Sequence, residues 1–207
     1  MKTKIAVFVS GGGTNLQALI DAASAGKLPS GEIVLVLASN AGAYALERAA
    51  KAGIPSAVVS AKTEGSQAAA EAKMNTLLEE AGVQLIVLAG YLSILSADFT
   101  RRWDRRILNI HPSLIPAFCG KGYYGLRVHE EALRRGVKVT GATVHFVNEI
   151  PDGGEILLQQ PVSVLPGDTP ETLQRRVMEQ AEWKLLPMAA EMISKQLMEE
   201  HQNVENV

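Results

Sequence analysis

The sequence predicts an α/β fold built on a doubly wound, mostly parallel β-sheet, with an antiparallel addition and a long C-terminal helix. Two observations support this fold. From residue 5 to residue 110, short apolar runs alternate with segments whose apolar residues follow helical spacing, as in sheets whose strands are buried on both faces. After residue 136, two strand-like stretches follow each other directly, which predicts antiparallel pairing at one edge.

The parallel part is expected to contain strands separated by helices. The predicted strands cover residues 5–9, 33–38, 57–59, 85–89 and 107–110. The predicted helices cover a segment with Leu16, Leu19, Ile20 and Ala23 at helical spacing, and residues 43–52, 67–81 and 98–106. Gly53 and Gly82 end two of these helices, since glycine is common just beyond a helix C-terminus.

The chain beyond residue 136 is expected to add two strands and the last helix. The strands cover residues 138–147 and 155–164, and the loop between them carries Asp152. The helix covers residues 169–196, with Pro170 at its first position, where proline is well tolerated. Its apolar side is predicted to consist of Leu173, Val177, Ala181, Leu185, Met188 and Met192.

Length and composition indicate a single domain over residues 1–207, since 47% of the residues are hydrophobic and 20% are charged. The net charge of −2 gives no general attraction to nucleic acid or to an anionic membrane. Cys119 is the only cysteine, which permits no internal disulfide and fits a reducing compartment. The apolar run after Lys4 is too short for a signal peptide or a membrane span. We therefore expect a cytoplasmic protein.

A glycine loop, Ser10-Gly11-Gly12-Gly13-Thr14-Asn15, follows the first predicted strand. Ligands of open α/β sheets bind beyond the carboxyl ends of the strands, and the amides at a helix N-terminus suit a phosphate monoester. Leu16 stands where a dinucleotide-binding loop would carry its third glycine, so a small phosphorylated substrate is favoured. The alternative is a tight turn in which Thr14 or Asn15 caps the helix.

Two polar side chains with catalytic potential follow each other on the strand over residues 107–110 and just beyond it. Asn109 and His111 are two positions apart and point to the same side. An amide can donate a hydrogen bond to a developing oxyanion, and an imidazole can donate or move a proton near neutral pH. A nearby Asp152 would orient the imidazole and favour its charged form. Together these groups suit attack on a carbonyl carbon.

Structural interpretations of the same residues stay open at this point. A His-Pro pair in a loop is most often structural, and an aspartate before two glycines is often an ordinary turn. Asn109 is harder to explain structurally, because a buried amide must find hydrogen-bond partners. His145 is expected either at the site or in a polar core, whereas His129 and His201 are expected at the surface.

Five segments occur in the order seen in one enzyme family. They are GGGTN at residues 11–15, LAGYLSILS at 88–96, NIHPSLIP at 109–116, GATVHFV at 141–147 and DGG at 152–154. Through these segments the chain resembles the phosphoribosylglycinamide formyltransferases, folate-dependent enzymes of purine synthesis, over about residues 4–195. The resemblance implies a Rossmann-like formyltransferase fold, with a phosphate-binding half over about residues 1–100 and a folate-binding and catalytic half over about 101–195.

The resemblance also implies a reaction and a set of residues. A formyl group would pass from 10-formyltetrahydrofolate, as co-substrate, to the amine of phosphoribosylglycinamide, with no metal and no tightly bound prosthetic group. Asn109, His111 and Asp152 match the catalytic residues of the family. The residues that match substrate-binding positions are Gly13, Thr14, Asn15 and Glu182 for phosphoribosylglycinamide, and Leu92, Ser93, Ile94, Leu95 and Asn109 for the folate.

The chain departs from the family pattern at four places. Glu182 fits only if one extra residue is allowed after Val177. Ser93 stands where better-known members carry arginine, and residues 62–68 lack the arginine often found near the phosphate, leaving Lys62 as a weak substitute. The segment over residues 117–127 is longer than in many relatives and rich in glycine and tyrosine, as expected for a lid.

Three other functions are weighed against this one. A formyltetrahydrofolate hydrolase would use water in place of the amine, but such enzymes usually carry an N-terminal regulatory domain, for which a first strand near Lys4 leaves no room. A methionyl-tRNA formyltransferase would need an RNA-binding domain. A non-catalytic phosphoribosyl-binding module is the alternative from a different class. The sequence does not set the oligomeric state, and a homodimer is one of the assemblies it allows.

Overall fold

The computed structural model describes residues 1–205, and in this part of the chain seven strands form one sheet with the order β3-β2-β1-β4-β5-β6-β7. β1 to β5 run parallel, whereas β6 and β7 are antiparallel additions at one edge. The strands are β1 (Thr3–Val9), β2 (Gly31–Ala38), β3 (Ser56–Val58), β4 (Leu85–Leu88), β5 (Ile107–His111), β6 (Val139–Phe146) and β7 (Ile156–Ser163). The predicted fold class is therefore confirmed.

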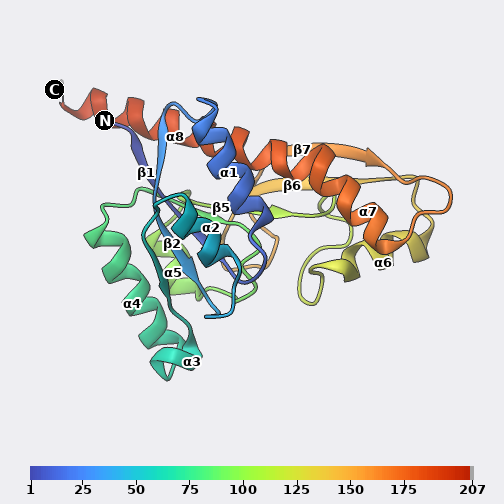
Figure 1. The fold of residues 1–207 in the computed structure, drawn as a ribbon, viewed down its shortest axis with the longest axis horizontal. Coiled ribbons are helices and arrows are strands. Elements are labelled where there is room, and N and C mark those ends of the chain that lie inside the picture. The colour runs from blue at the N-terminus through green and yellow to red at the C-terminus, as the bar shows by residue number, and fades with distance from the viewer. Residues whose placement is uncertain (206–207) are drawn as a thin grey trace.

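Helices cover both faces of the sheet, and Figure 1 shows α8 along the top of the molecule and α4 at the lower left. The helices are α1 (Thr14–Ser24), α2 (Ala45–Lys51), α3 (Ala61–Glu64), α4 (Gln67–Glu80), α5 (Ala97–Arg102), α6 (Leu126–Arg135), α7 (Pro170–Val177) and α8 (Trp183–Glu205), with a π-helical turn η1 (Met178–Glu182). In the described part of the chain, no helix is both long and apolar enough to cross a membrane.

Alternation along the strands divides the core into two layers. Val7 of β1 and Leu108 of β5 belong to the cluster under α1, α2 and α8, whereas Phe8 and Ile107 belong to the cluster under α4 and α5. This is the period of two expected of strands buried on both faces. Asn109 is two residues beyond Ile107, so it continues the face that α4 and α5 cover.

The chain reverses its direction of growth across the sheet between β3 and β4. β2 and β3 are added on one side of β1, and the chain then returns to place β4 on the other side. The loops after β1 and β4 therefore diverge to opposite faces and leave a crevice at the carboxyl ends of the strands, where open α/β sheets bind ligands. The glycine loop, the segment after Leu88 and the end of β5 all reach this crevice.

Two helices were not predicted, and one was predicted too long. α6 lies mostly in a region for which the sequence analysis predicts no element, although Val128 and Ala132 are four residues apart on its buried side and Gly136 follows its end in a left-handed conformation. α3 is a single helical turn whose N-terminus is stabilised by a capping box at Ser60. α5 ends at Arg102 rather than near residue 106, since Arg105 has a φ of 55°, which is incompatible with a continuing helix.

The C-terminal helix is not continuous, and this corrects the predicted buried face. The π-helical turn Met178–Glu182 separates α7 from α8 and accommodates one extra residue, which shifts the sequence period by one position beyond it. Beyond the turn, Leu186, Ala189 and Ile193 face the core, whereas Met188 and Met192 are 55% and 46% exposed. The predicted buried positions Met188 and Met192 are therefore wrong, because a single helical period was carried through the turn. The helix also continues to Glu205 instead of ending at residue 196.

This change of register can be measured by core substitutions. Leu186→Ala should lower the free energy of unfolding by about 2–5 kcal/mol, because it empties a fully buried position. Met188→Ala should change it by no more than about 0.5 kcal/mol. Urea unfolding of both variants makes the comparison, and equal losses would show that the two residues are equally buried.

Candidate active site

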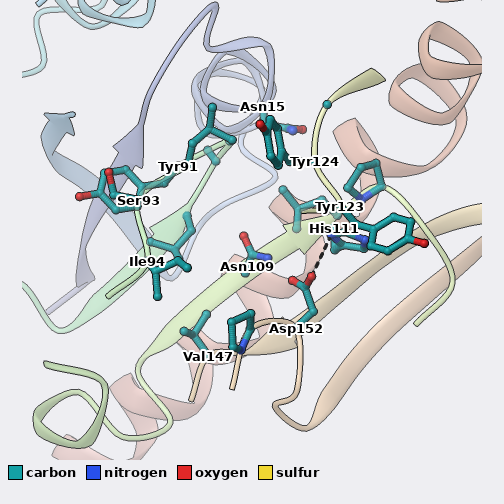
Figure 2. A pocket seen from close by; sticks show the side chains of 18 of the residues that line it. Asn15, Tyr91, Ser93, Ile94, Asn109, His111, Tyr123, Tyr124, Val147 and Asp152 are labelled. Atoms are coloured by element: carbon teal, nitrogen blue, oxygen red, sulfur yellow. Dashed lines mark ion pairs between the residues drawn. The ribbon is translucent and has the colours of Figure 1, made fainter. Parts of the chain in front are cut away.

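A cavity of about 730 Å³ opens at the carboxyl ends of β1, β4 and β5. Figure 2 shows its lining, with Asn15 and Tyr124 near one end, Ile94 and Ser93 along one wall, and Asn109, His111 and Asp152 at the floor. Its lining includes all eleven predicted site residues, of which Asn109 was predicted for two roles: Gly13, Thr14, Asn15, Leu92, Ser93, Ile94, Leu95, Asn109, His111, Asp152 and Glu182. The sequence thus predicted a set of residues that share one concave surface.

The glycine loop turns its carbonyl oxygens away from the cavity. The amide of Ala45 donates to the carbonyl of Gly11 at 3.1 Å, and Nε of Arg48 donates to that of Gly12 at 2.8 Å. Gly13 is the residue before α1, has a φ of 71°, and lies so close to Ala45 that an added Cβ would approach the Ala45 Cβ to 2.6 Å. This position therefore requires glycine.

No side chain of the described residues caps the N-terminus of α1, which overturns the alternative in which Thr14 or Asn15 is the cap. The first amides of a helix carry partial positive charge and need partners from outside the helix. An uncapped helix start facing a cavity is the arrangement that binds phosphate groups in other α/β proteins.

Asn15 points instead toward the C-terminal helix. Its Nδ2 donates to Oε2 of Glu182 at 2.8 Å, and both side chains are buried. Burial raises the pKa of Glu182 to about 7, although the hydrogen bond from Asn15 acts in the opposite direction. Glu182 is the last residue of the π-helical turn, so the extra residue after Val177 that the sequence comparison required is accommodated as this turn.

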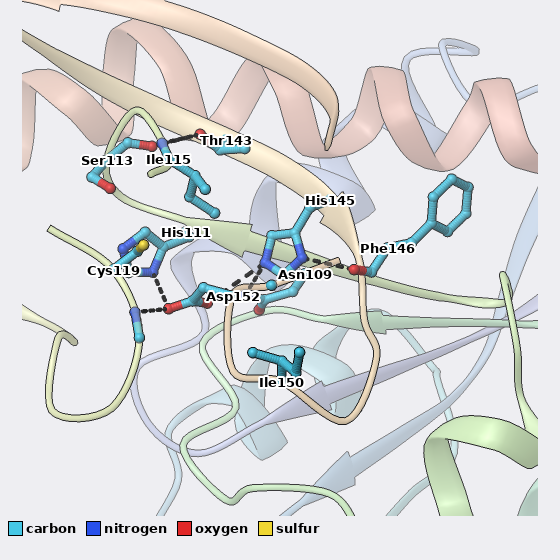
Figure 3. A network of polar contacts seen from close by, with 12 residues as sticks. Asn109, His111, Ser113, Ile115, Cys119, Thr143, His145, Phe146, Ile150 and Asp152 are labelled. Carbon is cyan, nitrogen blue, oxygen red and sulfur yellow. Dashed lines mark hydrogen bonds and ion pairs between the residues drawn. The ribbon is translucent and has the colours of Figure 1, made fainter. Parts of the chain in front are cut away.

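Asn109 is held by a partner that lies opposite it in the sheet. β5 and β6 pair so that Asn109 faces His145, and Asn109 Nδ2 lies 3.1 Å from His145 Nε2 (Figure 3). His145 Nδ1 lies 2.8 Å from the carbonyl of Phe146 and must donate to it, since a carbonyl only accepts. In the neutral ring Nε2 therefore accepts from Asn109, which orients the amide and leaves its second N–H for another partner.

His111 is buried and lies between two acceptors. Its Nε2 donates to the carbonyl of Phe118 at 2.9 Å, and its Nδ1 lies 3.5 Å from Oδ2 of Asp152. Burial lowers the pKa of His111 below its ordinary value, although Asp152 and the Phe118 carbonyl act to raise it. Asp152 thus acts in the direction expected from the sequence, but desolvation has the larger effect in the structure.

Asp152 is placed by an unusual backbone conformation. Its φ of 56° lies in the left-handed region, which aspartate tolerates better than most residues. The amide of Gly120 donates to Oδ2 at 2.7 Å, and His145 Nε2 lies 3.6 Å from Oδ1. Burial acts to raise the pKa of Asp152, but the contact with His145, together with His111 and the Gly120 amide, holds it below its usual range. A residue held in a sparsely populated backbone conformation and lining a cavity is typical of functional sites.

The segment after β4 forms the apolar wall of the cavity. Leu92 and Ile94 are both 62% exposed, whereas Leu95 between Ile94 and Ser96 is buried in the core. Large exposed apolar side chains at a cavity mouth suit a flat or aromatic ligand group. Ser93 also lines the cavity, so no arginine is supplied at this position.

The loop before α6 closes the opposite side of the cavity, and Figure 2 shows Tyr123 and Tyr124 projecting from it. Within the described chain, its Lys121 is the one lysine or arginine of the lining, and none of residues 62–68 contributes. Lys62 is therefore not brought to the site. Burial raises the pKa of the Cys119 thiol in this loop, with Asp152 acting in the same direction, which disfavours a nucleophilic thiolate.

His129 corrects a prediction. It was expected at the surface, but it is fully buried on α6, lines the cavity, and has no hydrogen-bond partner for either ring nitrogen among the described residues. Burial, with a smaller effect of His111, lowers its pKa to about 4. The signal was present in the sequence, because His129 follows Val128 on the apolar side of the unpredicted helix. His201 is exposed, as predicted.

Comparison with known proteins places the chain in a family. The family model described as formyl transferase matches residues 3–190, which is most of the chain. The chain belongs to the formyl transferase family. A structure of phosphoribosylglycinamide formyltransferase from Brucella melitensis superimposes on this formyl transferase with a TM-score of 0.85 and 42% identity, covering 94% of this chain and 96% of that one.

Relatives of this formyl transferase differ greatly in length. Phosphoribosylglycinamide formyltransferase of Haemophilus influenzae is 44% identical over 185 residues, which are 89% of this chain and 84% of that protein. The trifunctional purine biosynthetic protein adenosine-3 of Gallus gallus is 46% identical over 195 residues. The aligned region is 93% of this chain but only 18% of the trifunctional relative.

The buried carboxyl group of this formyl transferase makes its stability depend on pH. The pKa of Glu182 rises from 4.5 to about 7 on folding, so the native state binds more protons than the unfolded state between these values. The contribution of Glu182 to the free energy of unfolding should therefore fall as the pH rises through this range, whereas the lowered pKa of His129 contributes in the opposite direction. Glu182→Gln removes the contribution of Glu182 alone and should be more stable than the wild type at pH 8 by up to about 3 kcal/mol.

Urea unfolding at pH 5 and pH 8 measures this difference. The exposed Glu179 of the same turn provides the control, because Glu179→Gln alters a surface pair with Arg175 and should follow the wild-type pH dependence. A Glu182→Gln variant with the same pH dependence as the wild type would contradict a perturbed carboxyl group at this position.

Proposed function

We propose that this chain transfers a formyl group from 10-formyltetrahydrofolate to the amine of phosphoribosylglycinamide, a step of purine (IMP) biosynthesis. The observation that carries the proposal is that one cavity combines a site suited to phosphate with a set of catalytic side chains. At one end of the cavity lies an uncapped helix start with a glycine loop, and its floor combines Asn109, His111 and Asp152. The names of the Haemophilus and Brucella relatives support the same reaction for those proteins.

In the proposed reaction the amine nitrogen attacks the formyl carbon, and the carbonyl electrons move to oxygen. The resulting tetrahedral intermediate carries an oxyanion, which the free N–H of Asn109 and the Nε2 hydrogen of His111 stabilise. The bond between carbon and N10 of the folate then breaks. The proton lost from the amine is transferred to N10, with Asp152 and His111 assisting, directly or through water. The products are the formylated amide and tetrahydrofolate.

The proposal requires one rearrangement near His111. In the structure the Nε2 hydrogen of His111 is donated to the carbonyl of Phe118. We infer that this bond is exchanged for one to the oxyanion when the loop over residues 117–127 adjusts to the substrates. Gly120, Gly122 and Gly125 of this loop have positive φ values, as expected for a segment with little steric restriction. The loop would then act as a lid that excludes water from the intermediate.

The two substrates are assigned to opposite ends of the cavity. Gly13, Thr14 and Asn15 would hold the phosphate of phosphoribosylglycinamide through the amides at the start of α1. Glu182, beside Asn15, would accept hydrogen bonds from the ribose or the glycinamide group. Leu92 and Ile94 would contact the folate rings, with Ser93, Leu95 and Asn109 completing that subsite. The first half of the chain thus supplies the phosphate site, and the second half supplies the catalytic side chains.

The proposal names 10-formyltetrahydrofolate as co-substrate and no metal or tightly bound prosthetic group. Among the described residues no group of three or more His, Cys, Asp or Glu is arranged to hold a metal ion. Both partners are small molecules, and neither nucleic acid nor a membrane is required. A cytoplasmic location fits the single unpaired cysteine and two water-soluble substrates. The homodimer stays a prediction.

A spectrophotometric assay tests this function. Formation of tetrahydrofolate from 10-formyltetrahydrofolate should depend on added phosphoribosylglycinamide, because its amine is the attacking group. The formylated product should appear in equal amount. Deformylation at the same rate without the amine would identify a formyltetrahydrofolate hydrolase, and binding of phosphoribosylglycinamide without any turnover would identify a non-catalytic module.

Asn109→Ala separates binding from chemistry. Loss of one oxyanion donor should lower kcat by about 100- to 1000-fold, because this hydrogen bond is strongest in the transition state. Affinity for phosphoribosylglycinamide, measured by isothermal titration calorimetry, should stay near the wild-type value. Asn40→Ala is a suitable control, since Asn40 lies outside the cavity lining and its side chain accepts from the amide of Gly42 in its own turn. Unchanged turnover of Asn109→Ala would refute the assigned role.

A further inference from the structure

The cavity wall after β4 is fixed by hydrogen bonds from outside its own segment. The wall segment is defined here as residues 92–96. At its start, the amide of Leu92 donates to Oγ of Ser10 at 2.9 Å, and this hydroxyl also shares a 2.7 Å hydrogen bond with Ser39. At its end, Ser96 caps α5, since its Oγ accepts from the amide of Phe99 at 3.1 Å.

Two side chains from the first turns of α4 hold the second half of the wall segment. Oε1 of Glu71 accepts from the amide of Ser96 at 2.7 Å, and Oε2 accepts from the Ser96 hydroxyl. Nε2 of Gln67 donates to the carbonyl of Ile94 at 3.0 Å and to Oε1 of Glu71 at the same distance. Gln67 and Glu71 are four residues apart, so they lie on the same side of the helix.

Glu71 is a charged side chain in an unusual place. It is only 9% exposed, and it is packed beside apolar residues of α4 such as Ala70 and Met74, which belong to the core. A carboxylate is costly to bury unless hydrogen bonds compensate, and here three donors supply them. An apolar residue would anchor α4 to the core as well. The carboxylate supplies what an apolar residue could not, two acceptor oxygens for Ser96 of the wall segment.

The consequence appears at the side chains that face the cavity. Leu95 is buried in the core, while Leu92 and Ile94 project outward and are each 62% exposed. Exposed side chains on a loop are ordinarily mobile, since few contacts restrain them. Here the carbonyl of Ile94 and the amide of Ser96 are bonded to α4, and the amide of Leu92 is bonded to Ser10, so the Ile94 side chain is presented in one direction before any ligand arrives.

We propose that Glu71, with Gln67, is a positioning residue pair that preorganises residues 92–96 as the wall for the folate ring. This inference rests on the proposed function and adds residues outside the cavity lining to it. Glu71 acts through Ser96 and Ile94 and does not contact the substrate. A wall that is already ordered lowers the entropic cost of binding, so its effect should be seen on the folate and not on the other substrate.

Steady-state kinetics with both substrates tests the pair. Glu71→Ala should raise KM for 10-formyltetrahydrofolate by about tenfold, which corresponds to the loss of one net hydrogen bond. KM for phosphoribosylglycinamide should stay unchanged, because Glu71 and Gln67 bond to Ile94 and Ser96, whereas the glycine loop bonds to the other end of the wall segment, at Leu92. Glu71→Gln, which keeps one acceptor oxygen, should recover part of the loss. Gln67→Ala removes the exposed hydrogen bond to Ile94 and should give a smaller rise in KM for the folate. This variant tests the proposal if Glu71→Ala fails to fold.

Glu79→Ala is the matched control. Glu79 is on the same helix but is exposed and pairs with Arg102 of α5. It should leave KM for both substrates unchanged. Equal values of KM for the folate in Glu71→Ala and Glu79→Ala would overturn the proposal. A parallel rise of KM for both substrates in Glu71→Ala would also overturn it, because that result indicates general loosening of the fold.

Calorimetric titration with tetrahydrofolate, the product, gives the same comparison without turnover. The wild type should bind it more tightly than Glu71→Ala and with the same affinity as Glu79→Ala. An inactive wild type would refute the proposed function, whereas an active wild type with equal affinities in all three proteins would refute only the role of Glu71.

Discussion

The antiparallel pairing of β5 with β6 is the constraint on which the site depends. It sets Asn109 opposite His145 and His111 opposite Thr143, and it brings the loop with Asp152 back beside both imidazoles. In a paired strand a shift of one residue turns every side chain to the other face. A shifted β6 would therefore place apolar Val144 or Phe146 beside Asn109 and leave the amide without its acceptor. The strong apolar alternation of β6 secures the register that the polar residues require.

The site gathers ionisable groups in a place where water is largely excluded. Burial acts against the charged form of His111, His129 and Glu182 alike, and in Asp152 only the surrounding donors reverse this effect. Such groups reduce the stability of the empty protein. They are also the groups whose protonation can respond to an arriving ligand, since a new charge or hydrogen bond has a large effect where the dielectric constant is low. Burial of these side chains thus lowers the stability of the protein and at the same time makes their protonation more responsive to a ligand.

Much of the fold could be predicted from local patterns, because continuous apolar runs indicate buried strands and glycines indicate where helices end. The cavity position followed as well, since the glycine loop and Asn109 both lie at strand ends. The sequence left two places open for His145, because its bond to Asn109 joins residues 36 positions apart and depends on strand register. His129 was missed with its helix, and the assignment of Leu92 and Ile94 to the proposed folate subsite came from resemblance and not from periodicity. The buried face of α8 was wrong because a π-helical turn has no clear sequence signature.

That turn has a consequence for the length of the chain. Residues on either side of Met178–Glu182 serve different tasks: Leu173 and Val177 pack on the sheet, whereas Glu182 reaches toward Asn15. A π-helical turn holds about one residue more than an α-helical turn, so it absorbs one extra residue and leaves the two flanking segments in nearly the same relative orientation. Without that residue a regular α-helix would join the same two segments. The extra residue therefore lengthens the chain within the turn and moves neither the upstream apolar pair out of the core nor the carboxyl group out of the cavity.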